Sequence, residues 1–178
     1  MQSEMLGITG MRWYFAVALE CNSMVVDTLS WRGMVIIREK TQHRRTRISN
    51  WYYRKRLHRL DGPAAKRVYL GGLGNAKTWY VDGMRHRLDG PACYFGSGVT
   101  EWFLHDKLHR LNGPAVEFYG DKKWYLHGEL HRLDGPAVEY ANGRKEWWVD
   151  DNLHRLGGPA IERPDGANEW WMYGIHQY

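Results

Sequence analysis

A seven-residue motif that recurs five times constrains the fold of this 178-residue chain more than any other feature. Its first copy reads His-Arg-Leu-Asp-Gly-Pro-Ala, and a tryptophan stands seven residues before the histidine of every copy. The copies begin at His58, His86, His109, His131 and His154. The tryptophans, with Trp170 of a shortened sixth copy, are spaced by 28, 23, 22, 23 and 23 residues. A period of this length predicts small supersecondary units that stack on one another.

Turn residues inside each unit predict β-hairpins. Asp82-Gly83, between short runs suited to strands, is a strong hairpin signal. Pro91 lacks an N–H and disfavours helical backbone at the residue before it, which excludes a helix across the motif. We therefore predict an all-β fold, an elongated array of about five to six stacked β-hairpin repeats of period 22–23 over residues 51–178. Residues 1–50 lack the repeat and are predicted to form a short cap of helix or short strands at one end.

The motif itself is predicted to be structural. Each copy holds an imidazole, a guanidinium and a carboxylate, but a catalytic group is needed once and not at every unit. Asn112 and Gly157 replace the aspartate in two copies, which suits a turn former better than a general base. We expect no catalytic residue, no metal site and no cofactor. The residues taken to represent the structural motif are His131, Arg132, Asp134, Gly135 and Pro136.

Positive charge is concentrated in one segment. Residues 38–67 contain eleven Lys or Arg against two acidic residues, a net charge of +9, whereas the whole chain carries +5. Charge confined to one segment favours a binding patch over a long groove. The residues predicted to form this partner-binding patch are Arg44, Arg45, Arg47, Arg54, Lys55, Arg56, Arg59, Lys66 and Arg67.

The spacing of aromatic, glycine and histidine residues resembles that of a known repeat family. Tyr80-x-x-Gly83-x-x-His86, and less closely the stretch from Tyr125 to His131, are similar to the membrane occupation and recognition nexus (MORN) repeat. The His-Arg-x-Asp-Gly-Pro-Ala signature resembles a divergent branch of such repeats in phage and large-virus proteins. This resemblance implies β-hairpin units and a docking role, without assigning an activity. The viral likeness further implies a virus-encoded stoichiometric inhibitor of a host defence protein, acting in the host cytoplasm.

Two function classes are compatible with these features. The first is a non-enzymatic scaffold that binds an acidic protein partner, because Trp, Tyr and Arg at regular intervals are typical of binding hot spots. The second is a nucleic-acid-binding protein in which the basic segment contacts phosphates and Trp51, Tyr52 and Tyr53 stack on bases. We favour the protein partner, since the remaining units are net acidic. The apolar run from Met11 to Leu19 is too short to span a bilayer, and a cytoplasmic location is expected.

The C-terminal copy stops before any Asp-Gly-Pro turn and is rich in aromatic residues. An uncovered aromatic edge is an association site, so we predict a homodimer formed through this edge. The residues predicted to form the self-association edge are Trp170, Trp171, Tyr173, Ile175 and Tyr178.

Overall fold

The computed structural model describes the backbone of residues 6–7, 11–15, 24–31, 34–43, 46–70 and 74–177. Side chains are described for residues 37–42, 46–70 and 74–177. Every regular element in these ranges is a β-strand, which confirms the all-β prediction, and none of the described residues is helical. The described residues before position 44 are all in strands, and two of these strands, of eight and ten residues, are longer than the short strands or helix expected there.

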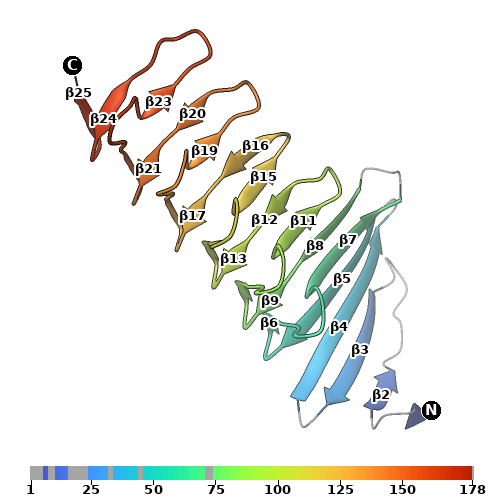
Figure 1. Ribbon diagram of the computed structural model, residues 1–178. Coiled ribbons are helices and arrows are strands. Elements are labelled where there is room, and N and C mark those ends of the chain that lie inside the picture. The colour runs from blue at the N-terminus through green and yellow to red at the C-terminus, as the bar shows by residue number, and fades with distance from the viewer. Residues whose placement is uncertain are drawn as a thin grey trace. The chain divides into compact units, whose positions relative to one another are not determined.

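The chain divides into two compact units, which are described separately. Residues 1–86 and 92–97 make up the first unit. Its strands form one antiparallel sheet in the order β1-β2-β3-β4-β5-β7-β8-β11, with β6 paired to β5 (Figure 1). The strands are β1 (Leu6–Gly7), β2 (Met11–Phe15), β3 (Met24–Trp31), β4 (Met34–His43), β5 (Thr46–Tyr53), β6 (Arg56–Leu57), β7 (Ala65–Tyr69), β8 (Asn75–Thr78) and β11 (Cys93–Phe95). The hairpin of β9 (Tyr80–Val81) and β10 (Met84–Arg85) follows β8.

Residues 87–91 and 98–178 make up the second unit, which is built from shorter hairpins. Its antiparallel sheet has the order β12-β15-β16-β19-β20-β23, so each copy of the motif adds two strands. These strands are β12 (Thr100–Glu101), β15 (Val116–Phe118), β16 (Asp121–Lys123), β19 (Val138–Glu139), β20 (Lys145–Glu146) and β23 (Ile161–Glu162). Two-stranded hairpins alternate with them: β13 (Phe103–Leu104) with β14 (Lys107–Leu108), β17 (Tyr125–Leu126) with β18 (Glu129–Leu130), β21 (Trp148–Val149) with β22 (Asn152–Leu153), and β24 (Trp170–Met172) with β25 (Ile175–Gln177).

The hairpin turns have the backbone that the sequence predicts. Asp82 and Gly83 both have positive φ, 51° and 86°, as a type I′ turn requires. The same left-handed pair occurs at Asp150 and Asp151, where no glycine is present. Aspartate tolerates this region better than most residues, and therefore the hairpin survives the loss of the glycine.

The backbone of the tryptophan in each copy holds the two ends of the motif together. The N–H of Trp124 donates to the carbonyl of Ala137 (2.8 Å), and its carbonyl accepts the N–H of His131 (3.2 Å). The same pair of bonds is made by Trp51, Trp79, Trp102 and Trp147. The motif alanine is fully buried in all five copies, which leaves no room for a larger side chain.

The arginine of the motif closes the loop over the tryptophan ring. The Arg132 guanidinium lies 4.1 Å from the Trp124 ring, and its Nη1 donates to the carbonyl of Pro136 (3.1 Å) and to Glu139 (3.2 Å). A Cβ added to Gly135 would lie 2.9 Å from Arg132 Cζ, so a larger residue there would displace the guanidinium from this position. Arg110 and Arg155 repeat this arrangement over their own tryptophans at 4.1 and 3.7 Å.

Replacing Arg132 with alanine is expected to lower the free energy of unfolding by about 1–3 kcal/mol, because it removes the ring contact and two donors. Replacing Asp134 should cost less, since its carboxylate is 84% exposed although it accepts a bond from Arg132 Nε. Urea unfolding followed by tryptophan fluorescence measures both. Asp134→Asn, the residue present at Asn112, is the control; equal losses for Arg132→Ala and Asp134→Ala would contradict this assignment.

Candidate functional site

Four neighbouring strands of the first unit bring five basic side chains to one face of the sheet. Residues that pair directly across antiparallel strands point to the same face. The pairs are Arg38 with Trp51, Lys40 with Ser49, Ser49 with Lys66, and Lys66 with Lys77. Arg47 lies two residues before Ser49 on β5 and so shares this face. We call the set Arg38, Lys40, Arg47, Lys66 and Lys77 the basic face.

The basic face borders a groove of about 630 Å³. Four of its cations, with Arg59, line this groove, and Asp61 is the one carboxylate among the lining residues. Asp61 accepts a 2.8 Å bond from Arg59 Nε, which lowers the pKa of its carboxyl. The groove therefore presents an excess of positive charge and is suited to an anionic group.

The basic face contains a pairing that costs stability. Lys66 and Lys77 are directly opposite each other on β7 and β8. Like charges in this position destabilise a sheet. At the described positions of this face on β4, β5, β7 and β8, no carboxylate offsets them, because Glu39 pairs with Asn50 and so points to the other face. An anionic partner would relieve this repulsion.

Trp51 lines the groove, but two guanidinium groups lie over its ring. The guanidinium of Arg38 is 5.0 Å from its ring and that of Arg59 is 4.4 Å away. The side chain is 7% exposed. Tyr52 lies on the opposite face, where burial and the Glu39 carboxylate raise the pKa of its hydroxyl. Neither ring is presented for stacking beside the basic face.

The predicted patch is brought together only in part. Arg47, Arg59 and Lys66 line the groove, whereas Arg67 alternates to the opposite face of β7. Arg54, Lys55 and Arg56 are exposed at the turn between β5 and β6. Arg44 and Arg45 lie outside the described residues. The predicted patch omitted Arg38, Lys40 and Lys77, which strand pairing alone reveals; period-two alternation would have identified the set if the register had been known.

The motif histidines His58, His109, His131 and His154 each connect their copy to the next hairpin. His58 Nδ1 accepts the N–H of Asp82 (3.0 Å), and His154 Nδ1 accepts that of Tyr173 (3.3 Å). At His131 the partner is the Asp150 carboxylate, 2.7 Å from Nδ1. These are links between neighbouring turns, and the described residues contain no group of three His, Cys, Asp or Glu that could hold a metal ion.

The C-terminal hairpin exposes aromatic and apolar side chains. Trp170 is 50% exposed, and Tyr173 and Ile175 are each 67% exposed. Trp171 is half-buried and donates from Nε1 to Glu169 (2.9 Å). Tyr178 lies outside the described residues. The predicted self-association edge is thus exposed at Trp170, Tyr173 and Ile175, and partly enclosed at Trp171.

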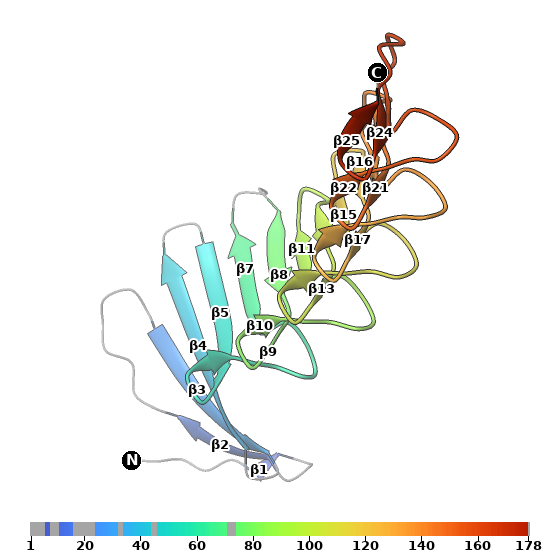
Figure 2. The same cartoon turned by 90° about the vertical axis from the view of Figure 1, so that its left-hand side faces the viewer.

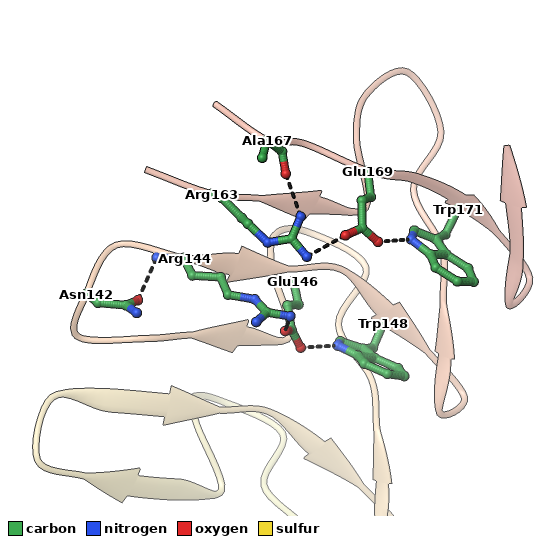
Figure 3. A network of polar contacts seen from close by, with 8 residues as sticks. All are labelled: Asn142, Arg144, Glu146, Trp148, Arg163, Ala167, Glu169 and Trp171. Atoms are coloured by element: carbon green, nitrogen blue, oxygen red, sulfur yellow. Dashed lines mark hydrogen bonds and ion pairs between the residues drawn. The ribbon is translucent and has the colours of Figure 1, made fainter. Parts of the chain in front are cut away.

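Two acidic side chains anchor the aromatic residue that follows the repeat tryptophan in the last two copies. Figure 3 shows Glu169 between Arg163 and the indole of Trp171, and Glu146 between Arg144 and the indole of Trp148. Glu146 is 4% exposed, so its charge is neutralised within the chain. Each anchor fixes one indole in place. Trp170 lies next in the chain to an anchored residue and is half exposed.

Comparisons with known proteins give no family assignment. The scan against family models, the search of curated proteins and the search of solved structures each returned no match. Within the described ranges, no helix is present that could cross a membrane.

A pH prediction follows from His109. Its Nδ1 accepts the N–H of His127 (3.1 Å), and burial, with the charge of His127 as a second cause, lowers its pKa below the ordinary 6.5. The folded state therefore favours neutral His109, and the unfolded state binds more protons below pH 6.5. The resulting stability is present above pH 6.5 and is lost as the pH falls from there towards the folded pKa.

Thermal melting between pH 8 and pH 5 measures this effect, with both limits chosen to bracket about pH 6.5. The melting temperature should fall further between pH 8 and pH 5 for the parent than for His109→Asn. The asparagine oxygen can accept the same N–H and does not titrate. Parallel curves for the two proteins would show that His109 contributes nothing to the pH dependence.

Proposed function

We propose that this chain is a non-enzymatic repeat scaffold that binds an acidic protein partner through the basic face. The observation that carries the proposal is the convergence of five cations from β4, β5, β7 and β8 on one sheet surface. A sheet fixes its side chains in position, so little ordering entropy is lost on binding. Carboxylates of the partner would relieve the repulsion between Lys66 and Lys77.

A protein partner fits the geometry better than a nucleic acid. Of the three predicted base-stacking residues, Trp51 is covered by Arg38 and Arg59, and Tyr52 belongs to the face that carries Glu39. Tyr53 shares the face of Trp51, but its ring packs against His58 and the guanidinium of Arg54. The second unit has 14 acidic against 10 basic residues, so the positive charge is not continued there. A single-stranded nucleic acid requires both a basic track and open aromatic rings.

The scaffold in this proposal is an array of five to six stacked hairpin repeats of MORN-like type over residues 51–178, with residues 1–50 as its cap. The likeness to viral repeat proteins adds a biological role, stoichiometric inhibition of a host defence protein in the host cytoplasm. Binding without chemistry suffices for such inhibition.

Charge reversal on alternate residues of β7 tests the basic face. Lys66→Glu is expected to weaken association with an acidic partner at least about tenfold at low salt, and the loss should shrink as salt rises. Arg67→Glu makes the same charge change on the opposite face and is the matched control. Association rates from surface plasmon resonance separate the two variants; equal losses would remove the basic face from the binding site.

Affinity purification from a host extract, with the full chain as bait, would identify the partner. The extract is used with and without nuclease treatment. We expect the captured protein to persist after nuclease treatment and to be lost with Lys66→Glu. Capture that disappears with nuclease would establish the nucleic-acid alternative instead.

Self-association through the C-terminal hairpin completes the proposal. The pair Trp170→Glu and Ile175→Lys removes two exposed apolar side chains without changing net charge. Light scattering at micromolar concentration should give twice the chain mass for the parent and the single mass for the double variant. Phe118→Lys, 49% exposed on β15, is the control and should remain dimeric. A parent that stays monomeric excludes the dimer.

A further inference from the structure

The third residue of the motif is a leucine in every copy, and every one of these leucines is exposed. Their exposed fractions run from 68% to 80%. Single exposed leucines are ordinary on a protein surface, but an exposed leucine at the same position of each unit is not scattered. The residues are Leu60, Leu88, Leu111, Leu133 and Leu156.

The other positions of the motif recur for structural reasons that do not apply to the leucine. Histidine links copies, arginine covers tryptophan, glycine admits the guanidinium, and alanine is fully buried. The fourth position, which is also exposed, varies among Asp, Asn and Gly. Leucine is therefore invariant at a position where the fold places little demand on it. An interaction outside the chain explains that invariance.

Grooves lie beside these leucines in the second unit. One, of about 560 Å³, is lined by the loops that carry Leu111 and Leu133 and by Trp124, Tyr125 and Leu126. A second of the same size is lined by the loop at Arg155 and by residues 170–172 of β24. Figure 2 shows the motif loops after the hairpins β13–β14, β17–β18 and β21–β22 projecting from one side of this unit. Leu111 and Leu133 thus line one groove, and the second groove lies beside the loop that carries Leu156.

The spacing of these leucines, which we call the leucine row, matches one periodic partner. Each copy adds two strands to the sheet, and strands are about 4.8 Å apart, so successive loops are about 10 Å apart. Seven residues of an α-helix rise about 10.5 Å. A helix with apolar residues at heptad spacing can therefore meet each groove in turn. Sheet twist limits the contact of a straight helix to about three loops.

The net charge of the second unit indicates the charge of the partner helix. Its net charge is −4, from 14 acidic and 10 basic residues. Asp89 and Asp134, next to Leu88 and Leu133, are each 84% exposed, although each already accepts a bond through Oδ1 from the arginine two residues before it. Lysine or arginine beside the apolar stripe of a helix would meet these carboxylates.

We propose that the leucine row of the second unit binds a cationic amphipathic α-helix of a partner protein, with its heptad-spaced apolar residues in the grooves between loops. An extended peptide is disfavoured because it would need backbone groups to pair with. The loops use theirs internally: Arg110 N–H donates to Tyr125, and the Pro114 carbonyl accepts from Arg110. This surface is distinct from the basic face and takes a partner of opposite charge.

The probes are three synthetic 21-residue peptides, about three heptads each. The first has leucine at heptad spacing and lysine elsewhere, the second is a scrambled sequence of the same composition, and the third replaces lysine with glutamate. Fluorescence anisotropy with the full chain should show binding of the first peptide alone, with helix formation detected by circular dichroism. Equal binding of the scrambled peptide, or binding without helix formation, overturns the proposal.

Variants locate the site. Leu111→Ser with Leu133→Ser should weaken binding of the first peptide at least about tenfold, because two apolar contacts are lost. Both residues are at least 75% exposed, so thermal melting should be unchanged. Leu111→Met with Leu133→Met should retain binding, and Phe118→Ser is the control for loss of an exposed apolar side chain elsewhere. Equal affinity for the serine variant and the parent overturns the assignment.

Discussion

The stacking of a motif arginine on the tryptophan eight residues before it is the interaction on which this fold depends. Arg155 lies 3.7 Å from the ring of Trp147 and also donates to the Pro159 carbonyl and to Glu162 (2.6 Å). One side chain thereby ties a hairpin, a loop and a sheet strand together. The described ranges contain few large, fully buried aliphatic side chains, so these local ties replace a conventional core.

A scaffold stabilised inside each copy leaves its outward positions available for recognition. The basic face of the first unit and the leucine row of the second unit use residues that the loop bonds do not need, with Arg59 the exception that serves both the loop and the groove. The two units carry net charges of opposite sign, +9 and −4, and the partners proposed for them differ in charge accordingly. In a repeat protein each copy contacts only its neighbours, so a surface on one copy can change without disturbing distant copies.

The sequence was sufficient to predict the β-hairpins, since Asp-Gly turns and a proline at a fixed period leave few alternatives. It predicted the basic segment but not the basic face. Lys66 and Arg67 are adjacent in sequence and equal in charge, yet β-strand alternation sends them to opposite faces. Lys77 joins Lys66 only through strand pairing across the intervening loop, which depends on register and not on local sequence. The sequence likewise did not predict that the leucines are exposed, because an apolar residue inside a repeated motif predicts burial.

The proposed helix partner also accounts for the residue type at the third position of the motif. A turn that only needed to place arginine over tryptophan could carry a polar residue at the third position, as it carries Asp, Asn or Gly at the fourth. Exposed leucine in five copies adds a risk of nonspecific association. This risk is small when a partner covers the leucines. A partner helix that contacts several loops at once would cover them. The loop that stabilises each hairpin is then also the element that presents the binding residue.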